Sequence, residues 1–468
     1  MGEVARSELP VVVIGAGPVG LAAAAQLVER GLEPLVVESG DRVAAAISSW
    51  GHVRLFSPWR YDVDPAARRL LEQAGWTAPD LDALPTGAEL VEQYLEPLAA
   101  TPTLAPRLRL GTRVVAVARD GADKTRSLGR ERRGYLVRTV DAAGQVVDVH
   151  ARAVIDASGT FGTSNPLGAS GLLAAGEADA ADFVTGPLPD VLGAQRGRFA
   201  GRHTLVVGMG HSAANTLLSL VELAETVPGT RVTWAIRGGS ARRLFGGGTD
   251  DELPARGLVG TRLKAAVDAG RLSLVTWTTI ERLVPGAGTV RVLGSARQDV
   301  FDVEVHAIVN ATGFRPDLGM LRELRLDLDP VVEAPSALAP LIDPNQHSCG
   351  TVPPHGETVL AHPDDGFYLA GMKSYGRAPT FLLATGYEQV RSIAAALAGD
   401  RAGADEVELS LPATGVCSSD LALGTEGGSC CGTAPAEPQL VELGLRAPVG
   451  VGFATGTLHG RSGDNQDA

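Results

Sequence analysis

A strand-to-helix turn near the start of the chain limits the possible folds more than any other feature. The apolar run Val11–Ile14 leads directly into Gly-Ala-Gly-Pro-Val-Gly at positions 15–20, and an uncharged helical pattern follows. In such a turn the first glycine permits the tight bend, the second lets a pyrophosphate reach the backbone, and the third lets helix and strand pack closely. The helix N-terminus then attracts the negative charge, because its first N–H groups are free. The expected dinucleotide contacts are Gly15, Gly17, Pro18 and Gly20.

A second strand and an acid complete this unit. The strand Pro34–Val37 ends in Glu38, about twenty residues after the glycines, where an acid holds a ribose hydroxyl. The uncharged stretch Leu9–Val28 is long enough for a membrane span, but it contains three glycines and two prolines. It also lacks the basic start and cleavage site of a signal peptide. We therefore expect a buried strand–helix unit.

Composition excludes some partners. The 468 residues leave room for two or three domains, and the net charge of -13 disfavours nucleic acid or an anionic membrane surface as the main partner. The 4 cysteines show no spacing of a disulfide framework, so the expected compartment is the cytoplasm.

A second glycine turn follows the strand His203–Val207. Its sequence at positions 208–213 is Gly-Met-Gly-His-Ser-Ala, in which alanine replaces the third glycine, a permitted variant. The next strand ends in Arg237, whose guanidinium can bind a 2′-phosphate that an acid would repel. This pattern favours NADP over NAD, although Arg237 can also be read as a plain surface arginine. The expected contacts are Gly208, Gly210, His211, Ser212, Ala213 and Arg237.

Three further strands end in small residues, which let a ligand approach the backbone. The first, Ala153–Asp156, leads to Ser158 and Gly159. The second, Val305–Asn310, leads to Thr312 and Gly313 and is expected to cross back into the first domain. The third, Phe367–Ala370, leads to Gly371 and Lys373 ahead of a helical pattern over 379–397. All six small or basic residues are candidate cofactor contacts.

The loop over 41–64 gathers aromatic and basic side chains, including Trp50, His52, Arg54 and Ser57. It is either a packed surface loop or a segment that crosses beneath a planar cofactor. The spacing of apolar residues predicts a helix over 87–100. Three strands over 114–118, 135–140 and 146–150 are expected to form a small antiparallel sheet, with the charged insert 120–133 as a mobile loop.

Together these segments resemble the flavoproteins with two dinucleotide-binding domains, specifically the flavin-containing monooxygenase branch, over roughly residues 8–400. The resemblance implies an α/β fold with two Rossmann-like domains and the cofactors FAD and NADPH. The FAD domain would be discontinuous (1–165 and 307–400), with the NADPH domain (166–306) inserted and a tail over 401–468. Blocks around Trp50–Trp59 and Gly371–Phe381 look like an uncharacterised bacterial subgroup, some members of which are associated with metal or arsenic resistance.

The chain departs from this pattern in three places. The monooxygenase fingerprint is only half present, because Phe161-Gly162-Thr163 has its glycine one place early and no histidine follows. Met372-Lys373 stand where related reductases carry an acid that binds the ribityl chain. The Cys-x-x-Cys of thioredoxin-type and glutathione-type reductases is missing.

Three functions remain open. The first is an NADPH-dependent FAD monooxygenase that uses oxygen on a small soft-heteroatom, arsenical or carbonyl substrate, with His52, Arg54 and Lys373 as catalytic candidates. The second is an NADPH-driven reductase of disulfides or quinones. The third is a metalloid-binding or sensor flavoprotein that uses Cys417, Cys430 and Cys431, since thiolates suit soft ions; the alternative is a tail with incidental thiols. No other metal site is expected.

Overall fold

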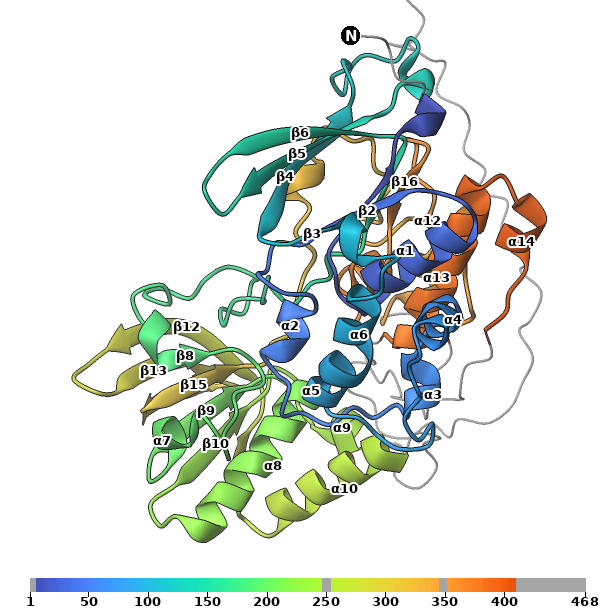
Figure 1. Cartoon of the computed structure of the whole chain (residues 1–468). Helices are drawn as coiled ribbons and strands as arrows, with labels where there is room; N and C mark the ends of the chain where they lie inside the picture. The colour runs from blue at the N-terminus through green and yellow to red at the C-terminus, as the bar shows by residue number, and fades with distance from the viewer. Residues whose placement is uncertain (1–5, 246–253, 345–351, 380, 410–468) are drawn as a thin grey trace, which may run out of the picture. The chain divides into compact units, whose positions relative to one another are not determined.

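The computed structural model describes residues 6–245, 254–344, 352–379 and 381–409. The chain divides into one compact unit over Met1–Leu421 and a second over Ala422–Ala468, which lies outside the described residues. The first unit contains two five-stranded parallel sheets and two three-stranded antiparallel sheets, with helices packed against the parallel ones (Figure 1). This arrangement confirms the predicted α/β fold with two Rossmann-like domains.

The first parallel sheet has the strand order β16-β7-β1-β2-β3. Its strands are β1 (Val11–Ile14), β2 (Pro34–Val37), β3 (Leu108–Arg109), β7 (Ala153–Asp156) and β16 (Phe367–Leu369). Helix α1 (Pro18–Glu29) packs against α13 (Leu383–Leu397), and both contribute to the core beside this sheet. Because β16 and α13 follow the second parallel sheet in the sequence, the first domain is discontinuous, as predicted.

Short helices surround this sheet. The α-helices are α2 (Ala45–Ser48), α3 (Trp59–Asp62), α4 (Pro65–Gln73), α5 (Gly87–Leu90), α6 (Glu96–Ala99), α11 (Ala339–Ile342), α12 (Glu357–Leu360) and α14 (Arg401–Asp405). The 3-10 helices are η1 (Arg6–Glu8), η3 (Ala105–Arg107), η4 (Arg130–Arg132), η7 (Gly319–Leu321) and η8 (Gly371–Tyr375). The helix predicted over 87–100 forms as α5, the π-helical turn η2 (Val91–Leu95) and α6. Pro97 lies in α6 and has no N–H to donate to the turn before it.

The second parallel sheet has the strand order β11-β10-β9-β15-β8. Its strands are β8 (Val184–Thr185), β9 (His203–Val207), β10 (Arg231–Ala235), β11 (Ser273–Val275) and β15 (Ala307–Asn310). Its helices are η5 (Ala181–Phe183), α7 (Arg196–Phe199), α8 (His211–Thr226), α9 (Arg242–Phe245) and α10 (Pro254–Asp268), of which α8 and α10 lie side by side (Figure 1). Among the described residues, no helix combines the length and the apolar character that a membrane span needs.

The predicted boundary between residues 306 and 307 is wrong by one strand. Strand β15 pairs with β9 and β8, so Ala307–Asn310 closes the second sheet, and the chain returns to the first domain only after Asn310. The sequence could not show this, because buried parallel strands of either sheet are equally apolar.

Each parallel sheet is accompanied by an antiparallel one. The predicted set near the start forms as β4 (Thr112–Arg119), β5 (Tyr135–Asp141) and β6 (Val146–Ala151). The second set is β12 (Thr278–Pro285), β13 (Val290–Ala296) and β14 (Asp299–Val305).

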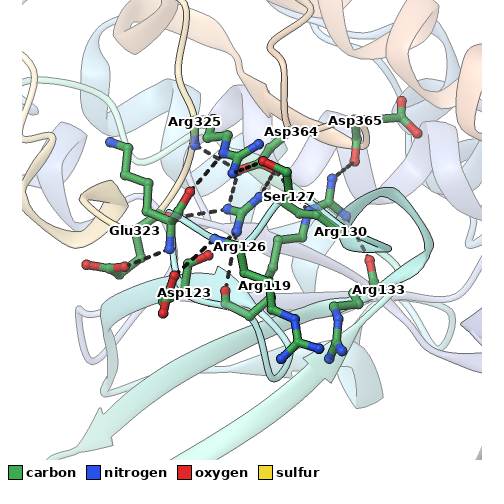
Figure 2. A network of polar contacts seen from close by, with 12 residues as sticks. Arg119, Asp123, Arg126, Ser127, Arg130, Arg133, Glu323, Arg325, Asp364 and Asp365 are labelled. Carbon is green, nitrogen blue, oxygen red and sulfur yellow. Dashed lines mark hydrogen bonds and ion pairs between the residues drawn. The ribbon is translucent and has the colours of Figure 1, made fainter. Parts of the chain in front are cut away.

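The charged insert 120–133 is anchored, so the expectation of a mobile loop is wrong (Figure 2). Arg130 is buried and donates to both carboxylate oxygens of Asp364, at 2.7 and 2.8 Å. Arg119, also buried, donates to the same carboxylate at 3.2 Å. Burial disfavours the charged form of Asp364, but hydrogen bonds from Arg130, the Arg325 N–H and Arg119 outweigh it and lower the pKa to about 2. The partner of this loop lies far away in the sequence, which is why local composition did not reveal the anchor.

Candidate functional site

The first glycine turn contains glycines of two kinds. A Cβ atom at Gly20 would lie 1.9 Å from the carbonyl oxygen of Gly15, and one at Gly15, where φ is +98°, would lie 2.9 Å from that of Ala157. The packing of the turn itself therefore requires these two glycines. A Cβ atom at Gly17, the N-cap of α1, would meet nothing within 4 Å. This glycine leaves open space in front of helix N–H groups that no side chain caps, and such a cradle fits a pyrophosphate.

Glu38 lies at the carboxyl end of β2, where the sequence placed it. Its Oε2 accepts a hydrogen bond of 2.8 Å from the N–H of Ala16, and its Oε1 accepts one of 2.7 Å from the N–H of Gly40. The carboxylate therefore braces the glycine turn from the neighbouring strand.

The second glycine turn repeats this division. A Cβ atom at Gly208, where φ is +132°, would lie 1.9 Å from the carbonyl oxygen of Ala311, whereas one at Gly210, the N-cap of α8, would meet nothing within 4 Å. Ala213 is fully buried at the place of the third glycine, and Ser212 precedes it in the first turn of α8. The N-terminus of α8 thus offers a second phosphate cradle.

Two side chains flank the second turn. Arg237 follows β10 and is exposed, and its guanidinium makes no ion pair with any described residue. His211, the first residue of α8, has its ring 5.3 Å from the ring of Phe56 in an edge-on arrangement. The loop of the first domain thus reaches the nucleotide turn of the second.

A buried ion pair lies where β7 and β16 end. Nζ of Lys373 is 2.7 Å from Oδ2 of Asp156, and their side chains are 1% and 0% exposed. Ser158 links the two, because its hydroxyl accepts from Lys373 at 3.0 Å and donates to Asp156 at 2.6 Å. The Cα of Ser158 also lies against Gly15, 2.9 Å from where a Cβ there would be. This cluster therefore supports the back of the first glycine turn.

Two other glycines at strand ends are close to this cluster in the sequence. Gly159 and Gly371 have positive φ values of 70° and 68°. The N–H of Gly371 donates to Oε1 of Gln389 at 2.8 Å, and a Cβ atom at Gly371 would approach Val19 in the first turn of α1 to 3.2 Å.

Of the predicted site residues in the loop over 41–64, two make internal contacts and two line a pocket. Trp50 packs against Gly87, where a Cβ atom would lie 2.9 Å from the indole. The Ser57 hydroxyl donates to Oδ1 of Asp62 at 2.7 Å. His52 and Arg54 line a pocket of about 410 Å³, which Lys373 does not line. The three catalytic candidates therefore do not share this pocket.

Thr312 and Gly313 lie at the crossing between the domains. The hydroxyl of Thr312 donates to the carbonyl oxygen of Asn165 at 2.9 Å, and the N–H of Asn165 donates to the carbonyl oxygen of Gly313 at 2.9 Å. The ring of Phe161 is 5.3 Å from that of Phe314. The two chain crossings thus lie side by side and are hydrogen-bonded to each other.

Asp156 and Asp62 are among the buried acids that the sequence did not single out. Asp156 could have been noticed as the only charged residue at the end of a strand that is otherwise apolar. Asp62 is fully buried, and its Oδ2 has no hydrogen-bond partner among the described residues. Burial raises its pKa to about 7, although the Ser57 hydrogen bond acts in the opposite direction. No local sequence signal marks Asp62.

The thiols of the metalloid hypothesis belong to parts of the chain that are not described. Cys417, Cys430 and Cys431 lie outside the described residues, as does Cys349. Within the described ranges, no cluster of three or more His, Cys, Asp or Glu side chains could hold a metal ion.

Two parallel sheets, each with a glycine turn that opens onto a helix N-terminus, define an oxidoreductase with two dinucleotide-binding domains. The chain belongs to the family described as "Pyridine nucleotide-disulphide oxidoreductase", which it matches over residues 12–349. Membership makes the chain a flavin-dependent pyridine nucleotide oxidoreductase and confirms the expected cofactors, FAD and NADPH.

Solved structures agree on the fold. Bacillithiol disulfide reductase from Bacillus cereus aligns with a TM-score of 0.63 at 19% identity, covering 84% of this chain and 99% of that one. The FAD-bound cadaverine monooxygenase DfoA from Erwinia amylovora aligns with a TM-score of 0.59 at 14% identity, covering 88% and 99%. Ornithine N-hydroxylase from Kutzneria sp. 744 aligns with a TM-score of 0.55 at 18% identity, covering 85% and 100%. No curated protein sequence matches the chain.

Proposed function

We propose that the protein is an FAD-dependent, NADPH-consuming monooxygenase that acts on a small molecule. One observation carries this choice: Cys349 is the only cysteine before position 417, so neither glycine-turn domain contains a dithiol that could pass electrons onward. The proposed substrate is a soft-heteroatom compound, an arsenical or a carbonyl compound, and the proposed co-substrate is oxygen. The cytoplasm remains the predicted compartment.

The two glycine turns have parallel roles in this proposal. Gly17, Pro18 and the α1 N-terminus hold the FAD pyrophosphate, and Glu38 contacts the ribose while it braces the turn. Gly210, His211 and Ser212 hold the NADPH pyrophosphate, and the guanidinium of Arg237, which no described carboxylate pairs, binds its 2′-phosphate. When bound, FAD supplies a ring that accepts a hydride from NADPH and then reacts with oxygen.

Lys373 acts as a positioning residue in this proposal. Its ammonium is buried and already paired with Asp156 and Ser158, so it has no free path to a substrate proton. Through Ser158 it fixes the strand end that packs against Gly15. Loss of the cation would therefore act on the shape of the FAD turn.

His52 and Arg54 are the residues that we propose for substrate contact, because both line the pocket beside α8. Arg54 is a fixed cation that donates to the carbonyl oxygen of Leu84 and lies 3.8 Å from Glu89.

A flavin reductase is the second candidate. The fold likeness to a bacillithiol disulfide reductase favours this candidate. In it, electrons would pass directly from the flavin to a bound disulfide or quinone. The third hypothesis, metalloid binding by Cys417, Cys430 and Cys431, stays a prediction.

The reaction with oxygen separates the first two candidates. The FAD-loaded protein is reduced with NADPH without oxygen, then mixed with oxygen while the flavin absorbance and released hydrogen peroxide are followed. A monooxygenase returns to the oxidised spectrum in two resolved phases, and a substrate lowers the peroxide yield per NADPH. A single slow phase, together with rapid reoxidation by an added disulfide or quinone, would establish the reductase instead.

A further inference from the structure

The pocket beside α8 is a third site, separate from both nucleotide turns. Its apolar wall comes from both domains: Val53, Leu55 and Phe56 from the first, and Leu218, Leu258 and Val259 from α8 and α10 of the second. No residue of the turns at 15–20 or 208–213 lines it. A volume of about 410 Å³ and a wall that combines apolar side chains with polar ones fit a small-molecule site.

The pocket is coupled to the NADPH turn by one contact. Phe56 lines the pocket, and its ring packs against His211, the first residue of α8. A molecule in the pocket therefore lies one side chain away from the helix N-terminus that receives NADPH.

The charged groups of the lining favour an anion. Arg54, on the loop, and Arg262, on α10, supply two cations, whereas Glu222, on α8, is the one acid of the lining. Neither Arg262 nor Glu222 makes an ion pair with a described residue, so no described carboxylate competes with a ligand for the Arg262 guanidinium. Two cations on an apolar wall are notable in a chain with a net charge of -13, because they concentrate anions locally.

We propose that this pocket binds a small organic anion with an apolar body, such as an aromatic carboxylate or sulfonate. The apolar part lies against Phe56, Leu218 and Val259, and the anionic group is held by Arg262 with Arg54. The proposal that the anion binds here depends only on the residues that line the pocket. That the bound anion is the substrate rests on the proposed function.

The test uses the FAD-loaded protein with saturating NADP⁺, so that both nucleotide sites are filled. The probe is 8-anilinonaphthalene-1-sulfonate, an aromatic anion whose fluorescence rises in apolar surroundings. We expect one saturable site and a loss of affinity of about tenfold in Arg262→Glu, which is about 1.4 kcal/mol. The matched control is Lys264→Glu, which makes the same charge change on the same helix, outside the lining, where Lys264 pairs with Asp268 at 2.6 Å. We expect this control to bind within about twofold of the wild type.

A second variant tests the pocket without a change of charge. Ser219→Phe fills the space with a ring and should abolish saturable binding, while FAD and NADPH binding persist. Equal weakening by Arg262→Glu and Lys264→Glu would overturn the proposal, as would equally tight binding of the uncharged N-phenyl-1-naphthylamine. Reoxidation of the NADPH-reduced variants by oxygen is measured in parallel without probe. A failure of anion binding with normal oxygen kinetics refutes only the pocket, and the reverse result refutes only the monooxygenase.

Discussion

Nζ of Lys373 lies 2.7 Å from Oδ2 of Asp156, and this pair supports the first glycine turn through Ser158. Removing one partner of a buried ion pair leaves an uncompensated charge and costs about 3–5 kcal/mol. We therefore expect Lys373→Met to lower the melting temperature and the FAD content strongly. The double variant Lys373→Met with Asp156→Asn should regain most of the stability but still bind FAD more weakly. Lys264→Met, at an exposed ion pair, is the control. Full FAD content in Lys373→Met would contradict the proposed support of the first glycine turn.

The two open glycines allow a crossed experiment. Because a Cβ atom at Gly17 or Gly210 meets nothing within 4 Å, Gly17→Ala and Gly210→Ala should fold with melting temperatures close to the wild type. We expect Gly17→Ala to lose FAD and Gly210→Ala to keep FAD but raise the KM for NADPH about tenfold, since each methyl occupies a phosphate cradle. Gly20→Ala, with its 1.9 Å clash, should be unstable regardless of ligand. If both open variants bound both nucleotides normally, the cradles would have been misassigned.

Arg237 should set the choice of nicotinamide cofactor. Arg237→Gln removes a charge-assisted contact and should lower kcat/KM for NADPH about tenfold to a hundredfold, with little change for NADH. Arg231, the exposed first residue of the same strand β10, provides the control Arg231→Gln. An equal loss with both cofactors would assign Arg237 to the fold rather than to the 2′-phosphate.

The raised pKa of Asp62 predicts a pH-dependent stability. Burial raises this pKa to about 7, so between about pH 4 and pH 7 the folded chain keeps a proton that the unfolded chain releases. Stability therefore falls as the pH rises through this window, by up to about 4 kcal/mol. Asp62→Asn should raise the melting temperature at pH 8 and change it little at pH 4. The exposed Asp82→Asn serves as the control, and an effect independent of pH would contradict the prediction.

The lowered pKa of Asp364 predicts the opposite dependence, a stability that rises with pH. Its carboxylate stays ionised in the fold down to about pH 2, so its contribution is present above the ordinary value of 3.8 and is lost as the pH falls towards 2. The free energy of unfolding, measured with denaturant between pH 5 and pH 2, should be lower in Asp364→Asn than in the wild type at pH 5. It should also fall less steeply as the pH is lowered. The buried Arg119 and Arg130 would be left without their acid in this variant. If the free energy of unfolding fell with pH as steeply as in the wild type, other carboxylates would govern the loss of stability at low pH.

The sequence predicted what depends on neighbours along the chain. Both glycine turns, the acid at the end of β2 and the helix around Leu90 follow from short patterns of residue type, and they formed where expected. Contacts over long separations could not be predicted in this way. The pairing of Asp156 with Lys373, the anchor of Arg130 on Asp364 and the second-sheet position of β15 each join residues that only the folded chain brings together.

The side-by-side crossings at Asn165 and Gly313 have a consequence for how such a protein can be rearranged. The N–H of Asn165 donates to Gly313, and the N–H of Arg315 donates to Thr163, so the inserted domain begins and ends at nearly the same place. A gene that joins position 164 directly to position 315 would therefore remove the whole inserted domain without stretching the remaining backbone. The strands on either side of the splice, β7 and β16, are already hydrogen-bonded neighbours. Because both chain crossings lie at one place, the inserted domain can be exchanged for another nucleotide-binding domain at that single junction.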